Sequence, residues 1–515
     1  MRLRNVVIPL AAIALAAAAS VNLVGGAGIR GVAPAADPVA AVVPAGLERF
    51  YSQRLDWTPC EAGECATVEV PLDYTRPDGR TLRLAAFRAP ARGRDVGALV
   101  VNPGGPGASG ITYARQLSRA VSKSMTRSLD LVGFDPRGVG ASEPLHCLDT
   151  AATDAYVSID PTPDDASERT ALERGGTEFG RACVKADPEL VSHMSSVDAA
   201  RDLDVIRASL GQRRLNYLGS SYGTLVGVDY LALFGANAGR IVLNGAIDPT
   251  LDGDQIALGQ AEGFDAAAAA YARDCTTRSD CPLGDDPAAA AARLAAIVSG
   301  LDARPVHTSN GPGLLNEAWG TFGVAQALYS TVLWPRLTTA LTDLTSVDAE
   351  HPDGNGDALM ALAMDYTGRD AGGGYENNSL QAINAVSCAD RGAVVPGMDH
   401  VAELARTAKQ QSPLFGSYLG WARTACATWP VASTGRPGPA TSAGDANPVM
   451  VVGTTNDPAT PYRWSVALAG QLPTGVLVTR RGDGHTGYLM GSRCTDRAVD
   501  TYLLTGKAPE DDITC

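Results

Sequence analysis

The chain has 515 residues, of which 45% are hydrophobic and 19% are charged, so it can bury the core of a large domain. Its formal net charge of −14 at pH 7 argues against binding to nucleic acid or to an anionic membrane surface. No segment after residue 30 has the length and apolar composition of a membrane span.

The N-terminus has the pattern of an export signal. Arg2 and Arg4 give a basic start, residues 6–19 are apolar and rich in alanine, and residues 17–19 offer a cleavage site of small side chains. We therefore predict that residues 1–36 are a signal peptide and flexible leader, and that the protein is secreted. Because the run of low charge continues further, a membrane-anchored form is the alternative.

The ten cysteines support an oxidising compartment, where an even number indicates disulfides. The sequence does not determine their connectivity. Pairing neighbours in order is the simplest arrangement, and it gives Cys60–Cys65, Cys147–Cys183, Cys275–Cys281, Cys388–Cys426 and Cys494–Cys515. Since no C-x-x-C pair or nearby histidine cluster occurs, we expect no metal site and no cofactor.

Residues 45–250 alternate strand and helix patterns, which predicts the first part of an α/β core. Residues 66–72 and 81–86 are expected to form an antiparallel pair. Buried parallel strands are predicted at 98–101, 130–134, 215–218 and 240–245, with a helix at 198–210. The predicted fold class is α/β, with a mostly parallel, doubly wound sheet.

A glycine-rich loop at residues 102–110 follows the first parallel strand. Glycine lets a backbone N–H approach a substrate carbonyl oxygen, and Gly105 is our candidate donor of an oxyanion hole. The competing interpretation is a dinucleotide fingerprint, because G-x-G-x-x-G begins at Gly105 and Asp135 ends the next strand. Pro106 removes an N–H that phosphate binding would use, and the dinucleotide hypothesis leaves the three motifs below unexplained.

The pentapeptide Gly219-Ser220-Ser221-Tyr222-Gly223 joins a predicted strand to a segment with helical spacing. At such a turn the central serine is exposed above the sheet, and glycine at both flanks leaves room for it. A G-x-S-x-G pattern can arise by chance in a chain with 56 glycines, so it needs supporting partners. Ser221 is the candidate nucleophile, and the N–H of Tyr222 is the second candidate oxyanion donor.

Two downstream strand ends supply those partners. The predicted strand at 448–453 leads into a loop with Asp457, and the one at 476–479 leads into a loop with His485. Serine, then acid, then histidine is the order of an α/β-hydrolase triad. Asp483 is the alternative acid, but it precedes His485 by only two residues in the same loop. We therefore assign Asp457 as the acid and His485 as the base.

Residues 251–432 differ from the flanking parts because helical patterns replace strands. Helices are predicted at about 256–274, 286–299, 316–344, 356–366 and 399–410. An insertion between nucleophile and acid predicts a helical lid. Residues 432–447 read as a linker rich in Gly, Pro and Ser, and residues 445–515 complete the core.

In combination the motifs resemble the proline iminopeptidase group of α/β-hydrolases, and more closely its secreted tripeptidyl aminopeptidase branch. They are GGPG at 104–107, FDPRGVGAS at 134–142 and GSSYG at 219–223. Residues 448–515 are similar to the TAP-like segment that ends such proteins, and residues 382–390 are similar to a pattern in their lid. One departure is Asn102, which precedes the glycine loop where the iminopeptidases have histidine.

The resemblance implies a secreted serine exopeptidase that hydrolyses peptides from the free N-terminus through an acyl-enzyme. Such an enzyme must hold the substrate ammonium, and the lid carboxylates Glu376 and Asp390 are our candidates. The alternative is a carboxylic ester hydrolase, an esterase or lipase with the same triad. A non-catalytic binding protein would have no need of Ser221, Asp457 and His485. We expect peptide partners and a monomer.

Overall fold

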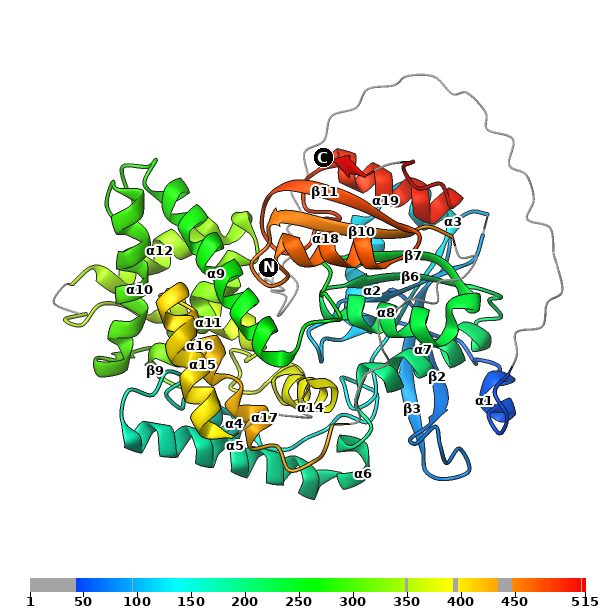
Figure 1. The fold of residues 1–515 in the computed structure, drawn as a ribbon, viewed down its shortest axis with the longest axis horizontal. Coiled ribbons are helices and arrows are strands. Elements are labelled where there is room, and N and C mark those ends of the chain that lie inside the picture. The colour runs from blue at the N-terminus through cyan, green and yellow to red at the C-terminus, as the bar shows by residue number, and fades with distance from the viewer. Residues whose placement is uncertain (1–42, 95, 348–350, 392–396, 434–446, 511) are drawn as a thin grey trace.

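The computed structural model describes residues 43–94, 96–347, 351–391, 397–433, 447–510 and 512–515. The predicted signal peptide and leader, and most of the predicted linker, lie outside these residues. Figure 1 shows a twisted sheet flanked by helices, with a second, helical part beside it. No helix among the described residues is long and apolar enough to cross a membrane.

The central sheet confirms the predicted α/β fold. Its order is β1-β2-β3-β5-β4-β6-β7-β10-β11-β12, and from β5 to β12 all neighbours are parallel. The first strands are antiparallel, as predicted. The bounds are β1 Thr58–Cys60, β2 Gly63–Pro71, β3 Thr81–Ala89, β4 Ala98–Asn102, β5 Asp130–Phe134, β6 Leu215–Ser220, β7 Ala238–Asn244, β10 Val449–Asn456, β11 Gly475–Asp483 and β12 Ile513–Thr514.

Both faces of the sheet are covered by helices. Along β4, Leu99 and Val101 join the core under one set of helices, whereas Val100 joins the core under the other. A strand buried on both faces reads as a continuous apolar run, which is why these strands could be predicted. One set is α2 Gly110–Ala120, α3 Lys123–Ser128 and α19 Arg493–Thr505; the other is α1 Glu48–Tyr51, α7 Ser196–Ser209, α8 Tyr222–Phe234 and α18 Tyr462–Gln471.

The helical part has its own hydrophobic core. It contains α9 Gly253–Cys275, α10 Pro287–Ala303, α11 Glu317–Leu328, α12 Trp334–Thr345, α13 Asp357–Thr367, α14 Ser379–Arg391, α15 Met398–Gln411, α16 Gly416–Trp421 and α17 Thr424–Ala427, with the short strands β8 Val306–His307 and β9 Leu314–Leu315. The single helix predicted at 316–344 was wrong. The chain forms α11 and α12, with Pro335 in the first turn of α12, where its missing N–H costs nothing.

Helices between β5 and β6 also reach the helical part: α4 Thr150–Val157, α5 Ala166–Ala186 and α6 Pro188–Val191. The ring of Phe179 in α5 stacks on Tyr156 of α4, with 4.8 Å between ring centroids. A Cβ atom on Gly176 would lie 2.6 Å from Thr428 Oγ1, so this glycine permits close packing in the middle of α5. The sequence analysis did not predict α5, because the glycines in the middle of this helix disfavour helical structure.

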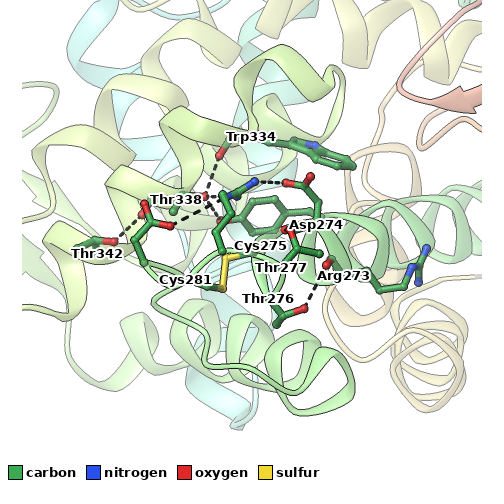
Figure 2. Close-up of a disulfide and its surroundings, with 12 residues drawn as sticks. Arg273, Asp274, Cys275, Thr276, Thr277, Cys281, Trp334, Thr338 and Thr342 are labelled. Carbon is green, nitrogen blue, oxygen red and sulfur yellow. Dashed lines mark hydrogen bonds and ion pairs between the residues drawn. A yellow bond between two sulfur atoms is a disulfide. The ribbon is translucent and has the colours of Figure 1, made fainter.

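The five disulfides pair neighbouring cysteines in chain order, as predicted. Figure 2 shows Cys275–Cys281, which closes the loop after α9 beside Trp334 and Thr338 of α12. Arg278 in this loop donates to Thr338 Oγ1 over 3.2 Å. The disulfide thus closes the loop that carries Arg278, and Arg278 connects this loop to α12.

Candidate active site

Ser221 lies at the sharp turn between β6 and α8, with φ of 55° and ψ of −125°. Its N–H donates to Asn244 O over 2.9 Å, and its carbonyl oxygen accepts from Thr224 Oγ1 over 2.6 Å. A Cβ atom on Gly219 would lie 2.3 Å from Gly223 O, and one on Gly223 would lie 2.8 Å from Asn102 O. Both flanking glycines are therefore sterically required, and the turn has the geometry of a nucleophile elbow.

Asp457 and His485 meet at the ends of β10 and β11. The distance from His485 Nδ1 to Asp457 Oδ1 is 2.8 Å, and Asp457 is only 2% exposed. The same carboxylate accepts from the backbone N–H groups of Ala459, Thr460 and Thr486. An acceptor at Nδ1 places the proton there and leaves Nε2 to take the proton of a serine hydroxyl.

The histidine is also held from the helical part. Its backbone N–H donates to Tyr329 O over 2.9 Å, and the two rings meet edge to face with 5.1 Å between centroids. Burial, Tyr366 and the charge of Asp457 raise the pKa of Tyr329 well above its usual value. In the described part of the chain Ser221 Oγ has no hydrogen-bond partner. Contacts of this kind often tighten only when substrate binds.

The glycine loop after β4 packs directly on the nucleophile turn. A Cβ atom on Gly104, where φ is +90°, would lie 2.7 Å from the backbone nitrogen of Tyr222. The N–H groups of Gly105 and Tyr222 have no acceptor among the described residues, and both residues line one cavity with Ser221. Asn102 holds the loop, because its Oδ1 accepts from Gly104 N over 2.8 Å. Both N–H groups are therefore free to act as the oxyanion donors that the sequence analysis predicts.

Asp135, which suggested a dinucleotide site, has another role. It is 3% exposed, and its carboxylate accepts from Ser109 Oγ and from the N–H groups of Ile111 and Ala141. These contacts tie two loops together and leave no place for a ribose. Asp135 is therefore not available as the ribose-binding acid that the dinucleotide hypothesis requires.

Asn244, at the end of β7, is a site residue that the sequence analysis missed. It is 1% exposed and its Nδ2 donates to Ser220 Oγ over 3.2 Å. Its Oδ1 accepts from Gly487 N over 2.9 Å and from Tyr488 N over 3.1 Å. One side chain therefore connects the nucleophile turn to the histidine loop. Its only sequence signal is a polar residue at the end of a buried strand.

Replacing Asn244 with alanine is expected to lower kcat by about 10²-fold while KM changes little, because the histidine loop loses its anchor on the nucleophile strand. Asn244→Asp keeps an oxygen for both loop N–H groups, so it should retain more activity than Asn244→Ala. Steady-state kinetics on a chromogenic substrate would measure both. Equal losses in the two variants would contradict this role.

A cavity of about 400 Å³ opens above Ser221 between the sheet and the helical part. Most of its wall is apolar or aromatic, with rings from Tyr156, Phe179, Phe264, Phe322, Tyr329, Tyr366, Phe415, Tyr418 and Trp421. Among the described residues, only Asp390 and Arg423 bring a charge to this wall. Helices α4, α5, α9, α11, α13, α14, α16 and α17 all contribute residues to this wall.

The structure brings one of the two candidate lid carboxylates to this cavity. Asp390 of α14 is 5% exposed, and its Oδ2 accepts from the hydroxyl of Tyr222 over 2.7 Å. Its Oδ1 accepts from Ser196 N and Ser196 Oγ over 2.8 and 2.9 Å. Glu376 is exposed and does not line the cavity, so the geometry does not support it as a ligand of the substrate ammonium.

The nucleophile elbow, the two N–H donors and the aspartate–histidine pair at the ends of parallel strands define an α/β-hydrolase of the serine hydrolase class. Comparison with known families agrees. Residues 97–331 match the alpha/beta hydrolase fold family, and residues 412–515 match the TAP-like protein family.

Three relatives place the chain more narrowly. It is 39% identical over 490 residues to serine protease Hip1 of Mycobacterium tuberculosis, covering 91% of this chain and 92% of the relative. It is 40% identical over 467 residues to carboxylesterase B of the same organism, covering 89% and 88%. It is 31% identical over 479 residues to tripeptidyl aminopeptidase of Streptomyces lividans, covering 90% and 86%. The chain belongs to the tripeptidyl aminopeptidase-like family of α/β-hydrolases.

Proposed function

We propose that this protein is a secreted serine exopeptidase that hydrolyses peptides from the free N-terminus. The observation that carries the proposal is the cavity over Ser221, whose wall includes one carboxylate, Asp390. Helices line this cavity on several sides and leave less room for the middle of a long chain, and a carboxylate suits a terminal ammonium. The printed names of the Hip1 and Streptomyces relatives support peptide substrates. The five disulfides and the predicted export signal support secretion.

The reaction follows from the site geometry. His485 Nε2 takes the proton of Ser221 Oγ, which attacks the scissile carbonyl carbon, and the N–H groups of Gly105 and Tyr222 stabilise the resulting oxyanion. His485 then gives the proton to the leaving amine, and the peptide remains as an ester on Ser221. A water molecule, activated by the same histidine, hydrolyses that ester and restores the serine. Asp457 holds the ring and stabilises its positive form.

The proposal that Asp390 receives the substrate ammonium is supported by its contact with Tyr222, the residue that follows the candidate nucleophile. Its Oδ2 meets the hydroxyl at the far end of the Tyr222 side chain, while the backbone of Tyr222 lies at the oxyanion hole. The carboxylate thus sits one tyrosine side chain away from the reacting carbonyl. Burial and the charge of Asp390 raise the pKa of Tyr222 well above its usual value, so this hydroxyl remains a hydrogen-bond donor.

An ester hydrolase is the second candidate function. The relative named carboxylesterase B and the aromatic cavity wall favour it, because an acyl chain needs apolar contact and no ammonium site. The triad and the oxyanion hole would act in the same way on an ester. The two functions differ in their need for a free amine.

The test compares Ala-Ala-Pro-p-nitroanilide with its N-acetylated form and with p-nitrophenyl butyrate. We expect kcat/KM for the free peptide to exceed that for the acetylated peptide by at least about 10²-fold, since acetylation removes the charge that Asp390 would hold. Hydrolysis of the butyrate alone would overturn the exopeptidase proposal and support the esterase. Equal cleavage of both peptides would overturn the ammonium site.

A further inference from the structure

Arg423 is the cationic residue on the described wall of the cavity, at the start of α17. Its side chain is 12% exposed, and its Nε donates to Asp254 Oδ1 over 3.0 Å. Its two Nη groups have no acceptor among the described residues. A guanidinium presents its donors in a planar fork that fits a carboxylate, so the Nη pair is available to an anionic group in the cavity.

The surroundings of Arg423 hold the guanidinium in place. Asp254 is fixed from its other side, where Oδ2 lies 2.5 Å from His400 Nε2. The guanidinium lies flat on the first residue of α9, because a Cβ atom on Gly253 would be 2.4 Å from Arg423 Cζ. Any other residue at position 253 would push the guanidinium away. The next residue, Thr424, also lines the cavity, and its buried hydroxyl has no hydrogen-bond partner in the described part of the chain.

The length of α9 indicates how far Arg423 lies from the loop that carries Asp457. Gly253 and Gln260 both line the cavity, and Gln260 Nε2 donates to Ala459 O, two residues beyond the acid of the triad. The seven residue steps from Gly253 to Gln260 span about 10 Å of helix. An extended peptide advances about 3.3 Å per residue, so this length of α9 corresponds to about three residues of a bound peptide.

The disulfide Cys388–Cys426 brings the two cavity charges to neighbouring elements. Its Cα atoms are 5.1 Å apart, and it joins α14, which carries Asp390, to α17, which begins beside Arg423. The carboxylate of Asp390 could then bind a positive charge, and the guanidinium of Arg423 a negative charge, on the N-terminal residue of one peptide. That residue would carry both an ammonium and a side-chain carboxylate.

We propose that Arg423 binds the side-chain carboxylate of an aspartate or glutamate at the N-terminus of the peptide, so that the enzyme favours acidic N-terminal residues. This inference rests on the proposed exopeptidase function. Arg423 acts as a specificity-determining residue, and it takes no part in bond cleavage.

The experiment uses three coumarylamide tripeptides with free N-termini: Glu-Ala-Ala, its isosteric neutral counterpart Gln-Ala-Ala, and Ala-Ala-Ala. For the unmodified enzyme we expect kcat/KM for the Glu peptide to exceed that for the Gln peptide by about 10-fold to 100-fold. In Arg423→Met the ratio should fall to about 1. Arg406→Met removes an exposed arginine on the outer surface of α15, and it should keep the full ratio.

The ratio is measured within one protein sample, so a partly unfolded variant does not alter it, and fluorophosphonate labelling counts the active molecules. A Glu-to-Gln ratio near 1 in the unmodified enzyme, or an unchanged ratio in Arg423→Met, would overturn the role of Arg423 alone. If none of the three peptides is cleaved while p-nitrophenyl butyrate is, the exopeptidase function fails and this inference fails with it.

Discussion

Replacing Ser221 with alanine is expected to lower kcat by about 10⁴-fold or more and to abolish labelling by a fluorophosphonate probe. The reason is that no other hydroxyl can take its place at the turn. The backbone of residue 221 is held at a positive φ by contacts to Asn244 O and Thr224 Oγ1, and only this position follows β6 directly into α8. Labelling and steady-state hydrolysis of a chromogenic substrate would measure both effects.

The adjacent serine provides a matched control within the same pentapeptide. Ser220 is 5% exposed, and its Oγ lies 3.1 Å from the hydroxyl of Tyr113 and 3.2 Å from Asn244 Nδ2. Ser220→Ala removes these hydrogen bonds, which costs about 1 kcal/mol of stability each, but leaves the nucleophile in place. We expect this variant to label. Labelling of Ser221→Ala would contradict the assignment of the nucleophile.

Replacing Asp457 with asparagine is expected to lower kcat by about 10⁴-fold with little change in fold or KM. The carboxylate accepts hydrogen bonds from His485 Nδ1, Ala459 N and Thr460 N on one oxygen, and from Thr460 Oγ1 and Thr486 N on the other. An asparagine must present its NH₂ group to one of these sets of donors. If it faces the ring, His485 is forced into the tautomer with its proton on Nε2, which cannot accept a proton from serine.

Asp483 supplies the control for this prediction, because it is the other acid in reach of the histidine loop. Its Oδ1 accepts from Asn456 Nδ2 over 2.6 Å, a contact between the last residues of β10 and β11. Asp483→Asn should therefore keep kcat within about threefold of the unmodified enzyme. A pH–rate profile on each variant would separate the two roles. Only Asp457→Asn should change which ring nitrogen of His485 carries the proton, and with it the ability of His485 to act as a base. Equal losses in both variants would contradict the choice of acid.

Much of the fold could be predicted because its signals are local. The strands β4, β5, β6, β7, β10 and β11 are buried on both faces, so each appears as a short apolar run. The candidate catalytic residues Ser221, Asp457 and His485 lie just beyond three such runs, and glycines near Ser221 and His485 indicate where the backbone turns sharply. The disulfides follow the simplest arrangement, neighbouring cysteines in chain order, although the sequence did not determine their connectivity.

The helical part was harder to predict because its signals depend on contacts between distant segments. Helix α5 contains three glycines that disfavour a helix locally but permit close packing: Gly175 against Ile159, and Gly176 and Gly180 against residues 428–430. Glu376 and Asp390 looked equivalent as lid carboxylates, yet only Asp390 belongs to a helix that packs beside the nucleophile turn. Which lid side chains are buried depends on which helices pack together, and the spacing of residues in the sequence does not indicate this.

The sequence by itself determined the fold class and predicted the order of the candidate catalytic residues, because both depend on strand ends along the chain. Only the tertiary structure decided which polar side chains share the cavity. Asn244 connects two loops that are more than 240 residues apart in the chain, as its bonds to Gly487 and Tyr488 show. Arg423 reaches the cavity wall because α17, α14 and the start of α9 converge there. Such convergence results from packing between elements that are far apart in the sequence, and local sequence patterns do not show it.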